Sequence, residues 1–367
     1  MITPFFPSKK SFVGTYVFDQ VNEINKQTNY RISIIKIVSL FSREKDYFFK
    51  DYKVCVFKVI DFPFFFFPGL FNKINNIRFK NFLKHKKIEN IYFSHAHVSY
   101  PASYLQSVLS CTKIIQHHGL DVLQLLNGRA NFLRRIQKDY LMKNTINVLN
   151  KADLNIGVSQ KVLNQLHQFD NYHPKNEIVL YNGVDRTKFY PSKKVNDVFT
   201  IGCIANFWKI KDHMTTIKSV KRLIDKGVKI KLRFVGTGKT LNSCKKYVNN
   251  NNLSEFIIFE KEMEHYELNK FYNDIDLFVL PSYYEALGCV YLESWATNTP
   301  FIAVKDQGIS EIIPKNLKNL MLVSKSCPTD LSKKINFFIE NKVNIEFDSK
   351  FDIRHTISEF LKNNIFQ

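Results

Sequence analysis

Short apolar runs alternate with helical patterns of apolar and polar residues along most of the chain. Such alternation is typical of parallel sheets whose strands are joined by crossover helices. The second half of the chain repeats the pattern of the first. The predicted strands are 31–38, 53–60, 90–94, 112–116, 153–158 and 177–180 in the first half, and 199–204, 230–235, 255–259, 276–280, 300–304 and 319–323 in the second.

Two doubly wound α/β halves in series predict two domains, which a length of 367 residues accommodates. Ligands of such folds bind at the carboxyl ends of the strands, so a cleft between the halves is the expected site. We expect an N-terminal domain at 1–185, a C-terminal domain at 186–350, and a last segment, 351–367, that returns to the first domain. Helices between the second-half strands are predicted at 212–226, 239–251, 265–273 and 288–297.

Positive charge is in large excess. Lysine and arginine number 53 against 33 aspartate and glutamate residues, which gives a formal net charge of +20. This excess favours anionic partners such as acidic lipids or phosphorylated ligands. An AT-rich genome is the alternative source, because Lys, Asn, Ile and Phe are abundant together. No zinc finger, RRM signature or helix-turn-helix pattern is present, so no nucleic-acid partner is expected.

The cellular compartment is predicted from three patterns. No apolar run approaches the roughly 18 residues of a membrane span, and no secretory signal precedes the first loop. The cysteines are widely spaced without a C-x-x-C pair, which indicates free thiols rather than a zinc site or a disulfide framework. A cytoplasmic protein is therefore expected. The six cysteines are Cys55, Cys111, Cys203, Cys244, Cys289 and Cys327.

The strongest chemical pattern follows the predicted strand 276–280. A loop after this strand contains Glu285, and the helix predicted at 288–297 carries Glu293. The turn into this helix presents backbone amides from Leu287 to Val290, which can hold a diphosphate or a sugar hydroxyl. Taken alone, each glutamate also has a simpler interpretation, such as offsetting the helix dipole. Together, in a strand-loop-helix setting, they favour a ligand site.

The segment from Glu285 to Glu293 resembles the E-x7-E motif of retaining glycosyltransferases with two Rossmann-like domains, and its surroundings are similar to family 4 of that group. Other motifs, in the family's order, extend the resemblance over nearly the whole chain. The resemblance implies the GT-B architecture, in which two Rossmann-like domains face each other across a cleft. These motifs are Pro4–Ser8 through Gly14, His95–His97, His117–Asp121, Ala152-Asp153 with Val158-Ser159, Asn182–Asp185, Val235–Gly238 and Gly308–Ile313.

The resemblance implies a role for each candidate residue. Glu293 would bind the nucleotide ribose, Glu285 would contact the transferred sugar, and Lys211 would stabilise charge on the departing diphosphate. His118 would lie near the donor sugar, and the backbone at Gly14 near the diphosphate. Without the resemblance, Lys211 could be a solvated lysine, His118 a structural histidine and Gly14 a glycine that only ends a turn. The expected catalytic residues are Glu285, His118 and Lys211, and the donor-binding residues are Gly14, Lys209, Leu287, Gly288, Cys289, Val290 and Glu293.

The chain departs from the family pattern at several positions. Asn206 and Trp208 lie in the stretch where members usually carry an arginine before the phosphate-binding lysine. Either Lys209 supplies the second cation, or phosphate stabilisation is weaker. Glycines common in the family are replaced by Ala286, Asn298 and Gln307. The loop at Pro4–Ser8 follows only Met1–Thr3, so the first strand is expected to start upstream or to be absent, with an exposed sheet position.

Asp274-Ile275-Asp276 imitates the D-x-D metal motif of another glycosyltransferase architecture. These carboxylates are predicted at the entry of a strand, whereas ligands bind at the opposite end. No metal is therefore expected, and the nucleotide-sugar is a substrate rather than a cofactor.

The expected function is retaining transfer of a sugar from a nucleoside diphosphate to a hydroxyl of a glycan or lipid-linked acceptor, in bacterial surface polysaccharide synthesis. The resemblance implies a hexosyltransferase-type enzyme in which the departing phosphate takes the acceptor proton on the same face. A phosphorylase or sugar-phosphate synthase on the same fold is an alternative. A non-catalytic protein that binds anionic lipid or nucleic acid is another.

The segment 73–87 mixes cations with Phe and Ile at helical spacing, after an apolar run at 64–71. Such a helix can lie on an anionic membrane. The alternative is a helix whose apolar face covers the first sheet. The membrane interpretation predicts a peripheral position on the inner face of the cell membrane.

Overall fold

The chain forms two α/β units in a computed structural model that describes residues 1–9, 11–61, 70–119, 121–122, 143–192, 196–341, 343 and 345–366. Unit 1 comprises Met1–Tyr181 with Thr356–Gln367, and unit 2 comprises Asn182–His355. The division falls after Tyr181 rather than after 185, because Val184 pairs with the end of unit 2. Its N–H donates to Phe351 O at 2.9 Å, and Ile353 N–H donates to Val184 O at 3.0 Å.

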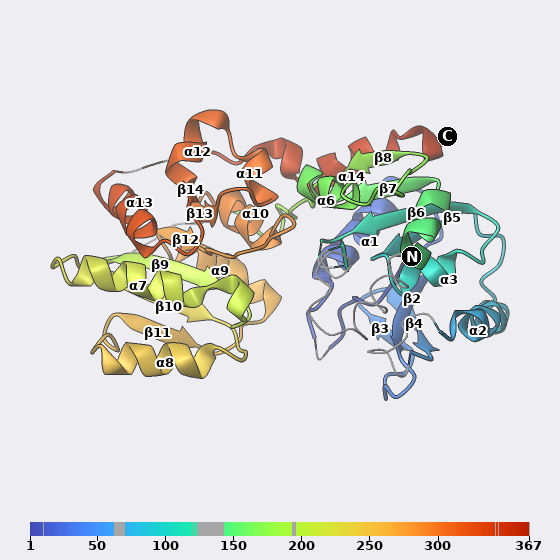
Figure 1. Ribbon diagram of the computed structural model, residues 1–367, viewed down its shortest axis with the longest axis horizontal. Helices are drawn as coiled ribbons and strands as arrows, with labels where there is room; N and C mark the ends of the chain where they lie inside the picture. Colours follow the sequence, from blue (N-terminus) through green and yellow to red (C-terminus); the bar gives the residue numbers. More distant parts are fainter. Residues whose placement is uncertain are drawn as a thin grey trace. The chain divides into compact units, whose positions relative to one another are not determined.

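Unit 1 is built on an eight-stranded sheet in the order β3-β4-β2-β1-β5-β6-β7-β8 (Figure 1). All neighbours are parallel except β3, which pairs antiparallel with β4. The chain runs outward from β1 in one direction and later from β5 in the other, so β1 and β5 flank the switch point. The strands are β1 (Ile2–Thr3), β2 (Ile34–Ser39), β3 (Tyr47–Phe49), β4 (Tyr52–Val59), β5 (Phe93–His97), β6 (Thr112–His117), β7 (Leu154–Gly157) and β8 (Glu177–Val179).

Strand β1 fills the central sheet position with two residues. Ile2 is in register with Ile35 of β2 and with Ala96 of β5. Both Ile2 and Thr3 are buried. The expectation that this position is exposed is therefore wrong, because two residues with strands on both sides close the sheet.

The helices of unit 1 bury apolar side chains, and the short α3 is buried at all five of its residues. Helix α1 packs Val17, Phe18 and Val21 into a cluster with Phe6 and Ile34. At the end of the chain, Phe366 meets Phe93 with ring centroids 5.2 Å apart. The apolar run predicted at 64–71 lies mostly outside the described residues. The helices with described bounds are α1 (Thr15–Gln27), α2 (Asn72–His85), α3 (Ala102–Gln106), α6 (Gln160–Leu166) and α14 (Ile353–Leu361), which begins in unit 2. Residues 143–151 are also helical.

Unit 2 contains a six-stranded parallel sheet in the order β11-β10-β9-β12-β13-β14 (Figure 1). From β9 the chain runs outward through β10 to β11, and then returns beside β9 at β12. Right-handed crossovers therefore place α7 and α8 on one face and α9 and α10 on the other. The strands are β9 (Phe199–Ile204), β10 (Ile230–Val235), β11 (Ile257–Glu260), β12 (Leu277–Val279), β13 (Phe301–Val304) and β14 (Leu322–Val323).

The helices of unit 2 are α7 (His213–Ile224), α8 (Leu241–Asn250), α9 (Leu268–Asn273), α10 (Cys289–Ala296), α11 (Ile309–Ile312), α12 (Lys315–Met321) and α13 (Pro328–Glu340). Trp295 on α10 is buried and donates its indole N–H to Glu346 O at 2.8 Å. All six cysteines of the chain carry free thiols, as predicted. Within the described residues, no helix combines the length and apolarity of a bilayer span.

Candidate functional site

The switch point of unit 2 lies between β9 and β12, where the two directions of the sheet begin. In doubly wound folds ligands bind in the crevice beyond the carboxyl ends of such strands. The segment after β9 carries Lys211, and the segment after β12 carries Glu285. The structure thus brings together two candidates separated by 74 positions in the sequence.

Lys211 and Glu285 form an ion pair. Lys211 Nζ lies 2.5 Å from Glu285 Oε1, and the two side chains are 26% and 10% exposed. The pair is therefore partly shielded from water, which strengthens the attraction. Lys209 begins the same 3-10 turn, Lys209–Lys211, and its side chain is exposed.

The turn that carries Lys211 is fixed by Asp212. This residue adopts a left-handed conformation, with φ 51°, and caps α7. Its carboxylate accepts hydrogen bonds from Thr215 Oγ1 at 2.8 Å and from Ser326 Oγ at 3.2 Å. These bonds position the lysine backbone at the edge of the sheet.

The backbone of Glu285 is held on both sides by the segment after β13. Glu285 N–H donates to Gln307 Oε1 at 2.8 Å, and Gly308 N–H donates to Glu285 O at 3.2 Å. Gln307 is buried. In the sequence Gln307 is marked only by the replacement of a common glycine, whereas in the structure its amide supports Glu285.

Helix α10 begins at Gly288, which has φ 87° and no side-chain cap hydrogen bond. A Cβ here would lie 2.7 Å from the ring of Tyr291, so both conformation and space favour glycine. Cys289 and Val290 form the partly exposed first turn, and Leu287 is buried. The first-turn amides of a helix have no intrahelical partners and favour anions.

Glu293 lies in the second turn of α10 and is buried. Tyr272, from α9, donates its hydroxyl to Glu293 Oε2 at 2.8 Å. His265 Nε2 lies 3.7 Å from Glu293 Oε1. Burial, and then the charge of Glu293, raises the pKa of Tyr272 well above its usual value, so the hydroxyl remains a donor. The sequence pattern does not distinguish Tyr272 from a core residue, because aromatic residues on a helix are usually core.

His118 lies in unit 1, directly after β6. Its backbone N–H donates to Asp121 Oδ1 at 3.1 Å, and His117 Nδ1 lies 3.2 Å from Asp121 Oδ2. Burial opposes ionisation of Asp121, but the bond and charge of His117 outweigh it and lower the carboxyl pKa to about 2. Burial lowers the pKa of His118 to about 4, so this imidazole is neutral at pH 7.

Gly14 is the N-cap of α1, with φ 91° and no side-chain cap hydrogen bond. A Cβ at this position would lie 2.5 Å from the backbone carbonyl of Phe5. Close packing of two backbone segments therefore requires glycine here.

The D-x-D pair lies at the entry of β12, as predicted. Asp276 Oδ2 accepts from Thr200 N–H at 2.7 Å, and Asp274 Oδ2 accepts from Lys270 Nζ at 2.6 Å. Both carboxylates therefore have structural partners. Among the residues that the structure describes, no group of three or more His, Cys, Asp and Glu side chains could hold a metal ion.

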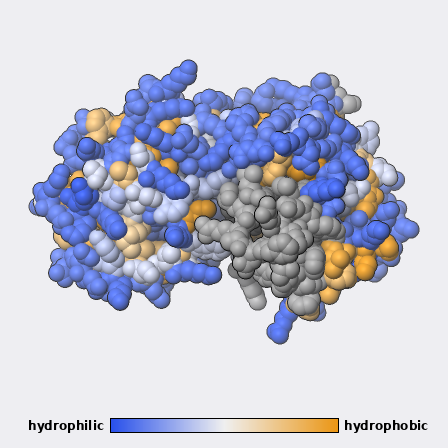
Figure 2. Space-filling view, viewed as in Figure 1, coloured by the Kyte–Doolittle hydropathy of each residue, from blue (hydrophilic) through white to orange (hydrophobic). Residues whose placement is uncertain are grey.

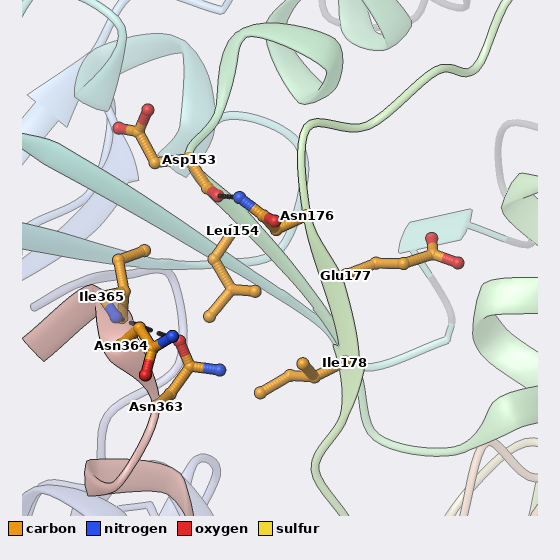
Figure 3. A pocket seen from close by; sticks show the side chains of 8 residues that line it. All are labelled: Asp153, Leu154, Asn176, Glu177, Ile178, Asn363, Asn364 and Ile365. Carbon is orange, nitrogen blue, oxygen red and sulfur yellow. Dashed lines mark hydrogen bonds between the residues drawn. The ribbon is translucent and has the colours of Figure 1, made fainter.

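A cavity of about 510 Å³ lies in unit 1 (Figure 3). Leu154 and Ile178 line it from the first residues of β7 and β8, together with 363–365 near the chain end. Figure 3 shows the side chain of Asn176 bonded to the backbone of Asp153, at a distance of 3.1 Å. This cavity lies at the amino ends of the strands, opposite to His118, and is not the predicted site.

Two family models match the chain in succession. The model described as glycosyltransferase family 4 matches residues 13–188. The model described as glycosyl transferases group 1 matches residues 185–355. Together they span almost the whole chain, and the boundary between them falls near the boundary between the units.

Curated relatives include two proteins of Staphylococcus aureus. Protein CapJ is 28% identical over 220 residues, which are 56% of this chain and 54% of CapJ. The capsular polysaccharide biosynthesis glycosyltransferase CapM is 26% identical over 156 residues, 41% of this chain and 39% of that protein. The chain thus spans about half or less of the curated relatives that it matches.

Solved structures share the fold. A glycosyltransferase from Rickettsia africae matches with a TM-score of 0.73 and 16% identity, over 100% of this chain and 98% of that one. Anabaena Alr3699/HepE, in complex with UDP and glucose, matches with a TM-score of 0.70 and 17% identity over 99% of each chain. The predicted α/β class with two parallel-sheet, GT-B type domains is confirmed.

Proposed function

We propose that this chain, which belongs to the family 4 glycosyltransferases, transfers a sugar with retention of configuration from a nucleoside diphosphate to a hydroxyl of a glycan or lipid-linked acceptor. The observation that carries the proposal is the Lys211–Glu285 pair at the ends of β9 and β12. A cation and a carboxylate at a switch point suit a ligand that combines phosphates with sugar hydroxyls. Glu293, on the adjoining helix, would receive the ribose.

The reaction needs one bond exchange at the anomeric carbon. The bond from this carbon to the phosphate oxygen breaks, and its electron pair leaves with the diphosphate. The acceptor oxygen bonds to the same face, and its proton passes to the departing phosphate oxygen. Lys211 and the first-turn amides of α10 would stabilise the charge that develops on the diphosphate. No metal is required in this proposal.

The donor and the pathway are proposed from the relatives. HepE is in complex with UDP and glucose, which makes UDP-sugars the first donors to test. CapM is named for capsular polysaccharide biosynthesis, and WaaB is a lipopolysaccharide outer core galactosyltransferase. Both names support a role in assembling a bacterial surface polysaccharide. This work would take place in the cytoplasm, at the inner face of the membrane.

Lysine substitution tests the reaction. In Lys211→Met the stem remains and the charge is lost, and we expect kcat to fall about 10²- to 10³-fold. The control is Lys221→Met, which breaks a lysine–aspartate pair of 2.7 Å on the surface of α7. Wild-type rates for the Lys211 variant would contradict the proposal.

A screen of ligands separates the alternatives. Thermal-shift measurements with UDP-, GDP- and ADP-sugars should find one stabilising donor. Turnover that depends on inorganic phosphate or on a sugar-phosphate acceptor would instead indicate a phosphorylase or a synthase. No stabilisation by any of these donors would favour a non-catalytic binding protein.

The outer face of α2 supports association with an anionic membrane. Its inner face buries Asn75, Phe79 and Leu83, and the Phe79 ring lies 5.1 Å from that of Phe57 on β4. The helix therefore covers the sheet, as the alternative interpretation predicts. The opposite face exposes Ile74 and Ile77 among the exposed lysines Lys73, Lys80 and Lys84.

Exposed apolar residues flanked by cations are the pattern of an interfacial helix, whose apolar side chains enter the headgroup region. Ile77 is 64% exposed. Figure 2 shows hydrophobic surface on the side of unit 1 where Figure 1 places α2, at the right of both views. Both uses of the helix are compatible, because they involve opposite faces.

Vesicle sedimentation tests the membrane surface. We expect Lys73→Glu with Lys80→Glu to weaken binding to phosphatidylglycerol vesicles at least about 10-fold, since each lysine near the surface contributes roughly 1 kcal/mol. The control, Lys246→Glu with Lys333→Glu, makes the same change of net charge on exposed helix positions of unit 2. Equal loss of binding in both double variants would refute a role for α2.

A further inference from the structure

Three imidazoles form a column at the carboxyl ends of β5 and β6 in unit 1. His95 and His97 alternate along β5 and so share a face, with ring centroids 4.5 Å apart and planes at 19°. The rings of His97 and His118 are 5.1 Å apart at 13°. His97 Nδ1 lies 2.8 Å from His118 Nε2, which is a hydrogen bond between the two rings.

The backbone and the ring of His118 are held by different groups. Asp121 accepts the backbone N–H of His118, and the same carboxylate accepts the backbone N–H of Ser99 at 3.0 Å. On the ring, Tyr16 lies with its centroid 4.7 Å away, and His97 occupies Nε2. Among the described residues, these contacts hold the backbone N–H and one ring nitrogen of His118.

The surroundings of His97 decide the position of its proton. A neutral imidazole carries one proton, on either of its two nitrogens. In the bond between His97 and His118, one ring must therefore donate its N–H and the other must accept. His97 is fully buried, and among the described residues its Nε2 has no hydrogen-bond partner. A proton on Nε2 would leave a buried N–H without an acceptor, which is rarer in proteins than an unsatisfied acceptor. The proton of His97 therefore belongs on Nδ1, where it is donated to His118.

We propose that His97 is a positioning residue that fixes His118 as the Nδ1–H tautomer, so that His118 offers a ligand a hydrogen-bond donor. His118 accepts at Nε2 from His97, and its remaining nitrogen carries the proton. The ligand group that it recognises is accordingly an oxygen with a lone pair, such as a hydroxyl or carboxylate oxygen. The catalytic half of this inference rests on the proposed function, whereas the tautomer does not.

The neutral state of both rings supports this assignment. Burial lowers the pKa of His97 well below its usual value, and that of His118 to about 4. A doubly protonated ring would place two N–H groups face to face in the 2.8 Å bond. At pH 7 both rings are therefore neutral, and one proton lies in the hydrogen bond between them.

Nuclear magnetic resonance measures the tautomer directly. Protein labelled with ¹⁵N-histidine, without any ligand, is recorded in a long-range ¹H–¹⁵N experiment, with His118→Asn for assignment. We expect a protonated Nδ1 and an unprotonated Nε2 for His118. His97→Leu should return His118 to the Nε2–H form that predominates in water. The control His95→Leu removes a buried ring of the same strand and should leave the tautomer unchanged.

A tautomer with the proton on Nε2 in the wild-type protein would overturn the proposal. So would an unchanged tautomer in a folded His97→Leu variant.

Conservative rescue separates positioning from packing. His97→Asn keeps an N–H donor near the place of Nδ1, while His97→Gln moves its amide toward the place of Nε2. We expect His97→Asn to retain kcat within about 3-fold. His97→Gln and His97→Leu should lose about 3- to 10-fold, the effect of one hydrogen bond. Equal losses in all three would overturn the role of the bond in turnover.

A failure of the proposed function can be distinguished from a failure of the role assigned to His97. If no donor binds and Lys211 variants behave like the wild type, the proposed function fails while the tautomer stands. If turnover depends on Lys211 but the tautomer is wrong, only the role of His97 fails.

Discussion

Glu293 accepts a hydrogen bond from the buried hydroxyl of Tyr272, and Tyr272→Phe removes that hydroxyl with little change to the packing. The ring of Tyr272 is fully buried and contacts Phe189 and Phe278, with centroids 6.0 and 5.6 Å apart. These contacts remain in the variant. The hydrogen bond of 2.8 Å to Glu293 Oε2 does not.

The expected magnitudes differ for stability and for binding. A hydrogen bond to a charged group contributes about 1.5–3 kcal/mol, and the free energy of unfolding should fall by that amount. The binding free energy of the nucleotide should weaken by about 0.5–1.5 kcal/mol, because binding must then order the Glu293 carboxylate, which Tyr272 no longer fixes. At about 1.4 kcal/mol for each factor of ten, the Kd should weaken about 2- to 12-fold. Saturating kcat should be unchanged, because Lys211 and Glu285 are intact.

Calorimetry with UDP, GDP and ADP measures the nucleotide Kd, and urea titration measures stability. The matched control is Tyr172→Phe in unit 1. It removes a tyrosine hydroxyl that donates to Glu177 at 3.4 Å, near the cavity of Figure 3. This control should leave the nucleotide Kd unchanged. A double variant with Glu293→Gln should show that the two effects on Kd are not additive.

Two results would refute the reasoning. One is a Tyr272→Phe variant that loses stability but binds the nucleotide as tightly as the wild type. The other is an additive double variant, since additivity means that Tyr272 does not act through Glu293. Either result would make Tyr272 a core residue without a part in donor binding.

Three further predictions follow from single side chains. Gln307→Met leaves the buried N–H of Glu285 without its acceptor, and should lower kcat and cost about 1–3 kcal/mol in urea titrations, with nucleotide Kd unchanged. Burial lowers the pKa of His95 to about 3. The unfolded chain therefore takes up this proton first, and stability should fall as pH drops from about 6.5 toward 3, by up to about 1.4 kcal/mol per pH unit, a slope that His95→Leu reduces. Gly14→Ala should destabilise by more than the roughly 1–2 kcal/mol of a left-handed conformation, because its Cβ also meets the backbone of Phe5.

Two strands of unit 2 could be predicted residue for residue, whereas the prediction 319–323 is wrong over 319–321, where helix α12 ends and only Leu322–Val323 form β14. The predictions 199–204 and 230–235 coincide with β9 and β10. Strands covered on both faces are continuously apolar, and hydrophobic runs therefore mark them well. In unit 1 the prediction 90–94 misses most of β5, Phe93–His97. The buried residues of this strand include two histidines, which a search for apolar runs does not register.

The candidate site was predicted as motifs but not as contacts. Motif order identified Lys211, Glu285 and Glu293. It could not identify Tyr272 or the supporting role of Gln307, which act across 21 and 22 positions of sequence. Such partners depend on how α9 and the segment after β13 pack beside the loops. Spacing along the chain does not encode that packing.

The pairing of Lys211 with Glu285 changes the interpretation of both residues. The resemblance implies separate partners for them, diphosphate for the lysine and sugar for the glutamate. Without a donor, each instead neutralises the other, with exposures of 26% and 10%. Removal of Lys211 leaves a partly shielded carboxylate without its cation, so the substitution also perturbs Glu285.

A bound diphosphate would compete with Glu285 for Lys211, and the stretch before this lysine offers Asn206 and Trp208 where members usually carry an arginine. Either Lys209 supplies a second cation, or Lys211 serves the leaving group with less support than in other members. Binding exchanges one anion for another around a single cation, so the net cost of breaking the pair is small. The carboxylate released in this exchange becomes available to sugar hydroxyls, which links recognition of the diphosphate to recognition of the sugar.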